Sequence, residues 1–83
     1  MTARASLQAG FARALKEKRS TAAVSQEELA DRASLHRTYI SQLERGLKSP
    51  SLAAIESLAL ALKLRPYELV KAAEDQASRR SVS

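Results

Sequence analysis

The sequence predicts an all-α domain of five helices, and three observations support this fold class. Only two Gly and two Pro occur in 83 residues, so few positions interrupt a helix. Hydrophobic residues make up 45% of the chain and recur at helical spacing in successive segments. Helix start and stop signals separate these segments. A single domain this small buries only about 60% of its unfolded surface, so a partner subunit would add stability.

The first expected helix spans residues 6–19. Its hydrophobic positions are Leu7, Phe11 and Leu15, spaced by four residues, and charged residues occupy the remaining face. Small and hydroxyl residues interrupt this pattern at 20–24, so we expect a loop there.

The second expected helix is short and begins at Gln26. Ser25 and Glu28 form a capping-box pattern, in which the hydroxyl accepts a backbone N–H and the carboxylate bonds back to the cap residue. A helix of about two turns is unstable alone, so packing must hold it. Its expected buried residues are Leu29, Ala30 and Ala33.

A tight turn at Ser34 and Leu35 leads into a third helix over about 36–45. Its expected inward side chains are those of Ile40 and Leu43. Gly46 ends this helix, because glycine adopts the left-handed conformation that commonly follows a helix.

Two further helices are expected over residues 51–62 and 66–75. Ser51 caps the first of them, which is so apolar that we expect it to be the most buried helix. Proline at the start of the second is favourable in a first helical turn. We therefore expect one domain over residues 1–75, whose two C-terminal helices form core and dimer interface, and a disordered tail over 76–83.

Composition excludes several classes of function. The absence of Cys and the single His remove disulfides, thiolate metal sites and most catalytic arrangements, so we expect no enzyme, metal or cofactor. No apolar run reaches the roughly 18 residues of a membrane span, and we expect a cytoplasmic protein without membrane contact. The net charge of +5 suits an acidic polymer as partner, although Arg79 and Arg80 lie in the expected tail.

The third helix carries side chains suited to the DNA major groove. An Arg can form two hydrogen bonds to guanine, a Gln can form two to adenine, and a Thr methyl can contact thymine. Early positions of a helix inserted into the groove lie deepest. We therefore expect base contacts from Arg37, Thr38 and Gln42.

Contacts to the DNA backbone are expected around these residues, because phosphate contacts fix the register of the recognition helix. The N-terminus of the second helix offers backbone N–H groups to a phosphate. Glu44 is expected to orient a basic residue instead, since a carboxylate is repelled by phosphate. The candidate backbone contacts are Gln26, His36, Tyr39, Ser41, Arg45 and Lys48.

Residues 25–46 resemble the helix-turn-helix of Cro and the phage repressors, in the family of regulators called XRE. The resemblance implies a λ-repressor-like five-helix fold and a homodimer that binds a palindromic double-stranded DNA operator. It extends from about Phe11 to Val70, and it is carried by SQEELA at 25–30, YISQLERG at 39–46, Pro50 with Ser51, and LALALKLRPYEL at 58–69.

The segment HRTYIS at 36–41 is similar to the controller proteins of restriction–modification systems. That branch consists of small dimers that regulate their own operon and the endonuclease gene, and it implies that Arg37, Thr38 and Tyr39 face DNA. Two features depart from the family pattern. Ser34 stands where Gly is usual, which would strain a backbone with positive φ, and the loop before Ser25 is longer than usual.

Two alternatives follow from the same fold. An antitoxin or other protein-interaction module would keep the helix-turn-helix but bind a protein, and the basic residues Arg37, Arg45 and Lys48 argue against it. RNA binding is disfavoured, because the major groove of an A-form helix is too narrow for a recognition helix.

Overall fold

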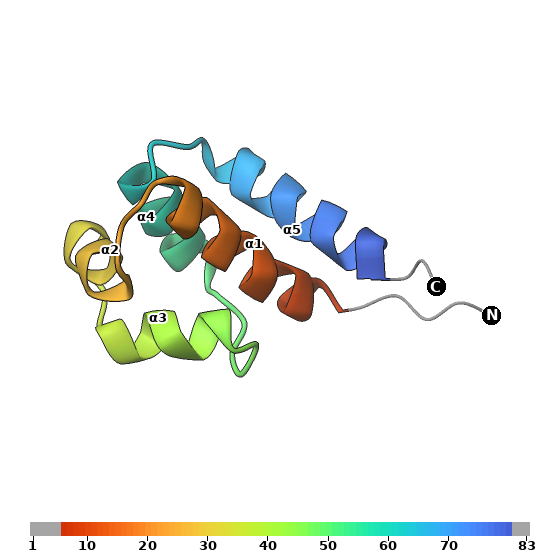
Figure 1. Cartoon of the computed structure of the whole chain (residues 1–83), viewed down its shortest axis with the longest axis horizontal. Helices are drawn as coiled ribbons and strands as arrows, with labels where there is room; N and C mark the ends of the chain where they lie inside the picture. Colours follow the sequence, from red (N-terminus) through yellow and green to blue (C-terminus); the bar gives the residue numbers. More distant parts are fainter. Residues whose placement is uncertain (1–5, 81–83) are drawn as a thin grey trace.

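The computed structural model describes residues 6–80 of the chain, with side chains to residue 78. These residues form five helices and no strand, as the sequence predicts. The helix α1 lies between α5 on one side and α3 on the other (Figure 1). The helices are α1 (Leu7–Thr21), α2 (Gln26–Ala33), α3 (Arg37–Glu44), α4 (Leu52–Ala61) and α5 (Pro66–Arg80).

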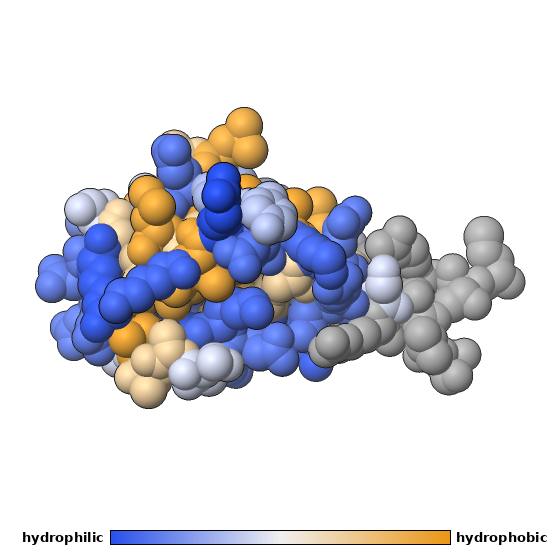
Figure 2. Space-filling view, turned by 90° about the horizontal axis from the view of Figure 1, so that it is seen from above, coloured by the Kyte–Doolittle hydropathy of each residue, from blue (hydrophilic) through white to orange (hydrophobic). Residues whose placement is uncertain are grey.

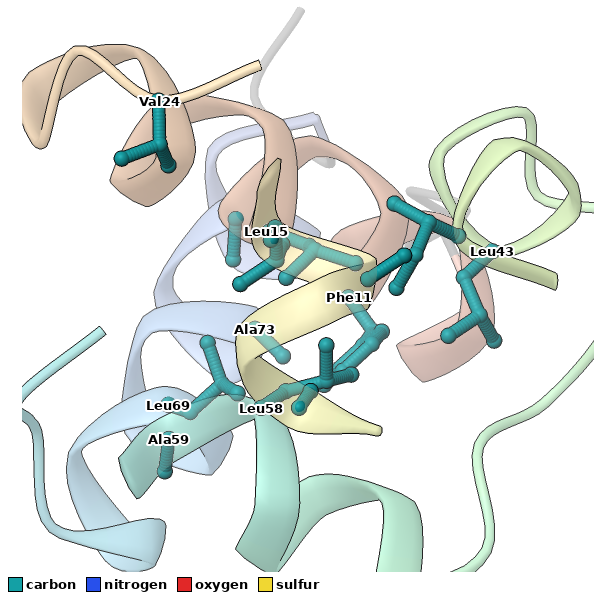
Figure 3. Close-up of a cluster of buried hydrophobic side chains, with 13 residues drawn as sticks. Phe11, Leu15, Val24, Leu43, Leu58, Ala59, Leu69 and Ala73 are labelled. Atoms are coloured by element: carbon teal, nitrogen blue, oxygen red, sulfur yellow. The ribbon is translucent and has the colours of Figure 1, made fainter. Parts of the chain in front are cut away.

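Every helix contributes a fully buried side chain to one hydrophobic core (Figure 3). Burying a side chain of this size stabilises the fold by about 1.5–3 kcal/mol, so detaching any one helix from the core would lower the free energy of unfolding substantially. No buried side-chain nitrogen or oxygen within the described residues lacks a hydrogen-bond partner. The largest fully buried side chains are those of Leu15, Leu29, Ile40, Leu43, Leu58 and Leu69.

The first four helices end in the same way. A residue in the left-handed conformation follows each helix, and the next residue donates its N–H to a carbonyl five residues earlier, a Schellman ending. Ser34 is one of these residues, with φ 58°, so the expected strain at this turn is present. The other three left-handed residues are Ala23, Gly46 and Lys63.

The helices α1 and α5 approach each other closely at Gly10. A Cβ placed on Gly10 would lie 2.3 Å from the carbonyl oxygen of Ala73 and 2.9 Å from the backbone nitrogen of Ala77. The expected disordered tail over 76–83 is therefore wrong for residues 76–80, which continue α5. Ala77 is buried against α1. This packing holds the last turns of α5, although the sequence after residue 75 shows no hydrophobic periodicity. Residues 81–83 lie outside the described residues.

Two local expectations, the end of α1 and the capping box of α2, differ from the structure. The helix α1 continues to Thr21, because the left-handed residue that ends it is Ala23. The hydroxyl of Ser25 accepts the N–H of Glu28 at 2.9 Å, but the Glu28 carboxylate accepts from the charged guanidinium of Arg32 instead of bonding back.

The helix α4 is not the most buried helix. Its apolar residues surround the whole helix, whereas only the face with Ala54 and Leu58 packs against the core. Leu52 in the first turn is 85% exposed, and Leu60, on the face opposite Leu58, is 65% exposed. Leu64, in the connection that follows α4, packs against the core.

We expect Gly10→Ala to lower the free energy of unfolding by about 2 kcal/mol, because the added methyl group meets backbone atoms of α5 that cannot rotate away. The direction is informative, since Gly→Ala within a helix otherwise raises stability by about 1 kcal/mol. Urea denaturation followed by circular dichroism measures the change. Ser20→Ala, at an exposed position of the same helix, is the control. Unchanged or increased stability of Gly10→Ala would show that α1 and α5 do not pack this closely.

Candidate nucleic-acid interface

The candidate interface consists of α2, α3 and the loop of residues 45–50 that follows α3. The helix α3 and this loop lie together along the lower edge of the molecule in Figure 1. The side chain of Ser25 caps α2, while His36 precedes α3 without a side-chain capping bond. The His36 imidazole is exposed and remains available to a partner.

Two buried side chains determine which face of α3 points outward. Ile40 and Leu43 are held in the core, so the opposite face is directed to solvent. Thr38, Gln42 and Arg45 follow one another at helical spacing along that outer face. The predicted base-contacting residues Arg37 and Thr38 are exposed, whereas Gln42 is half-buried.

Four of the six predicted backbone contacts, Gln26, Ser41, His36 and Tyr39, fall on the two flanks of this outer face. On one flank, a shallow hollow between α2 and α3 is lined by Gln26, Arg37, Thr38 and Ser41. On the other flank, Tyr39 packs partly against the core, and it shares a second hollow with His36 and residues of α4. The structure thus brings six of the nine predicted residues into two hollows, one on each flank of α3.

A buried ion pair fixes α3 relative to α1 and α2. Arg19 on α1 donates to Glu44 through Nε at 2.6 Å and through Nη2 at 3.0 Å, and their side chains are 16% and 3% exposed. Arg19 also donates through Nη1 to the carbonyl oxygen of Val24 at 3.0 Å. The hydrogen bond to Glu44 raises the pKa of the Arg19 guanidinium above its ordinary value, so Arg19 stays charged throughout the pH range of a folded protein.

Gln26 joins this ion pair from α2. Its Nε2 donates to Oε1 of Glu44 at 3.0 Å, which leaves the second N–H of the amide for another acceptor such as a phosphate. The expectation that Glu44 orients a basic residue is confirmed. Its partner Arg19 was not identified from the sequence, because it lies 25 residues away and resembles the other charged residues of its helix.

The loop of residues 45–50 is tied to α1 by a residue outside the predicted site. Gln8 donates through Nε2 to the carbonyl oxygen of Gly46 at 2.8 Å, and its Oε1 accepts the hydroxyl of Ser49. Lys48 is exposed between these two points. No sequence signal marked Gln8, because it follows a capping Ser in the first turn of an ordinary amphipathic helix.

The cations of the interface are free of ion pairs within the described residues. Arg37, Arg45 and Lys48 take part in none of the ion pairs found there, so their charge is available to a polyanion. The described part of the chain contains no cluster of three potential metal ligands. Within that same part, every helix is too short or too polar to cross a membrane.

Comparison with known proteins gives consistent matches. A family model described as helix-turn-helix matches residues 15–69. The control protein C.BamHI of Bacillus amyloliquefaciens is 49% identical over 47 residues, which are 57% of this chain and 58% of that protein. The chain therefore spans just over half the length of this relative.

Two solved structures resemble the fold. The clp gene regulator ClgR from Corynebacterium glutamicum is 26% identical, with a TM-score of 0.88 over 94% of this chain and 83% of that chain. The restriction-modification controller protein C.AhdI from Aeromonas hydrophila is 40% identical, with a TM-score of 0.73 over 75% of this chain and 94% of that chain.

We expect Glu44→Ala to lower the free energy of unfolding by about 3 kcal/mol, because it leaves the largely buried Arg19 guanidinium without its carboxylate. The matched control is Asp75→Ala, which removes the exposed partner of Lys71 and should change stability by about 0.5 kcal/mol or less. Chemical denaturation of both variants tests this. Equal effects of the two substitutions would contradict the role of the buried pair.

Proposed function

Because this chain belongs to the XRE-type helix-turn-helix family of transcriptional regulators, a family of DNA-binding proteins and not of enzymes, we propose that it binds a palindromic operator as a homodimer. Its five-helix λ-repressor-like fold is the one predicted from the sequence. The observation that carries the proposal is the outward polar face of α3, which bears cations without ion pairs and is held in place by Glu44.

We assign base contacts to three side chains of α3. Arg37 and Thr38 stand in the first turn and are exposed, so they enter the major groove first. Gln42 lies one turn after Thr38 on the same face, where its half-buried amide has fewer conformations to lose on binding a base. Guanine, thymine and adenine are the bases that these groups recognise by hydrogen bonds and methyl contact.

Contacts to the DNA backbone are proposed on both flanks of α3. Gln26 offers its remaining N–H beside the N-terminus of α2, and the packing of Tyr39 against the core fixes its ring next to His36. Arg45 and Lys48 provide charge at the other end of the helix. Ser41 completes the set within the hollow between α2 and α3. These contacts set the register of α3 and make affinity fall with salt.

Homodimerisation is proposed through α4 and α5. Leu52 and Leu60 on α4 are 85% and 65% exposed, and Tyr67 at the start of α5 is 65% exposed. Hydrophobic side chains are visible among polar ones on the side of the molecule where α5 lies (Figure 2). Apolar groups exposed on this small domain gain most from burial against a second copy, and a two-fold dimer requires a palindromic operator.

We further propose that the chain controls a restriction–modification system. The support is the 49% identity to the control protein C.BamHI and the 40% identity to the controller C.AhdI. Selection of bound duplexes from a random pool would give the operator. A site upstream of neighbouring restriction and modification genes would support the proposal, and its absence from such a locus would contradict it.

Arg37→Ala and Lys48→Ala should weaken DNA binding in different ways. Loss of Arg37 should cost about 1–3 kcal/mol on the selected operator and much less on random duplex, because a base contact disappears. Loss of Lys48 should weaken binding to both duplexes equally and flatten the salt dependence, because a phosphate contact disappears. Titrations on both duplexes at several salt concentrations measure the two effects. Equal losses for Arg37→Ala on both duplexes would remove its assignment as a base contact.

The chain should sediment as a dimer at micromolar concentration. Leu60→Glu should yield a monomer, because it places a charge within the proposed apolar interface. Leu47→Glu changes a similarly exposed leucine, 59% against 65%, in the loop after α3 and should leave the dimer intact. Analytical ultracentrifugation distinguishes these outcomes. A monomeric wild-type chain would refute the dimer.

A further inference from the structure

The side chain of Gln8 holds the loop after α3 at two points. Its Nε2 donates to the carbonyl oxygen of Gly46, 38 residues away, and its Oε1 accepts the hydroxyl of Ser49. Lys48 lies between the two bonded residues. Within the described residues, Gln8 is the only side chain from a helix that is hydrogen-bonded to this loop.

The two ends of the loop are otherwise held unequally. At the α3 end, Arg45 continues the backbone bonding of the helix by donating to Ser41, and Leu47 donates to Gln42 at 2.9 Å. The backbone groups of residues 48 and 49 take part in none of the backbone–backbone hydrogen bonds found in the loops and turns of the described residues. Lys48 therefore depends on Gln8 for a fixed position, whereas Arg45 depends on α3.

A glutamine is chemically suited to this position, because its amide donates and accepts at the same time. Glutamate would keep an acceptor for Ser49 but lose the donor to Gly46, and alanine would lose both. Gly46 approaches α1 closely enough that an added Cβ would lie 3.9 Å from Cβ of Ala12, so the loop already packs on the helix that carries Gln8.

We propose that Gln8 is a positioning residue for DNA binding, which fixes the loop so that the Lys48 ammonium lies where the DNA backbone passes the C-terminal end of α3. This inference rests on the proposed function. When the backbone of Lys48 is already fixed, the residue loses less conformational freedom on contact with phosphate. The protein then binds DNA more tightly. Gln8 itself touches no DNA in this arrangement.

A double-mutant cycle tests the proposal. The proteins are the wild type, Gln8→Ala, Lys48→Ala and the double variant, each titrated on the selected operator and on random duplex over a range of salt concentrations. Gln76→Ala is the matched control, because it removes another glutamine side-chain bond to α1, the one to Glu17 at 3.3 Å. Gln76 lines a hollow with Arg13, Lys16, Glu17 and Ser20, none of which belongs to the loop. Thermal melts establish that each variant is folded.

We expect Gln8→Ala to weaken binding to both duplexes by roughly 3- to 10-fold and to flatten the salt dependence toward that of Lys48→Ala. In the Lys48→Ala background, Gln8→Ala should have little further effect. Gln76→Ala should bind like the wild type. Independent, multiplying losses in the double variant, or a lower melting temperature with unchanged binding and salt slope, would overturn the proposal.

The experiment separates failure of the proposed function from failure of the inference about Gln8, and fallback variants cover a Gln8→Ala protein that does not fold. If wild-type protein binds no duplex, the proposed function has failed; if it binds and Gln8→Ala binds equally well, only this inference has failed. Should Gln8→Ala not fold, Gln8→Glu and Ser49→Ala each remove one of the two bonds and are judged by the same cycle with Lys48→Ala.

Discussion

The ion pair between Arg19 and Glu44 joins three helices at one buried point. Arg19 comes from α1, Glu44 closes α3, and Gln26 adds the first turn of α2. A carboxylate that is only 3% exposed must be fully satisfied, because a buried charge without partners would cost several kcal/mol. The pair therefore ties α2 and α3 to α1, and together with the buried Ile40 and Leu43 it holds the polar face of α3 outward.

The helix α1 carries all three constraints that build the interface, although none of its residues was expected to contact DNA. Gly10 lets α5 pack against one side, and Arg19 fixes α3 on the other. Gln8 reaches the loop after α3. The proposed DNA-binding surface is thus supported by contacts from α1, and such support preorganises a binding site.

Two groups of basic residues can be distinguished in the described part of the chain, those paired with acids and those left unpaired near α3. Arg32 and Lys71 are paired with acids on the same helix, whereas Arg37, Arg45 and Lys48 are left without such partners beside the recognition helix. The exposed apolar side chains include Leu52 and Leu60, which belong to α4 and not to α3. One small domain therefore presents a polar, cationic face and an apolar face, each suited to a different partner.

Local chemistry in the sequence was enough to predict five helices, the caps at Ser25 and Ser51 and the outward face of α3, because each depends on neighbouring residues and on helical periodicity. The strain at Ser34 was expected from the family resemblance, which places Gly there. The structure changed what depends on contacts between distant segments. Residues 76–80 are helical because Gly10 admits Ala77, and part of α4 is exposed because only one of its faces packs on the core. Arg19 and Gln8 gained roles through partners 25 and 38 residues away. Such partners are brought together by the packing of α1 against α3 and α5, which no local pattern encodes.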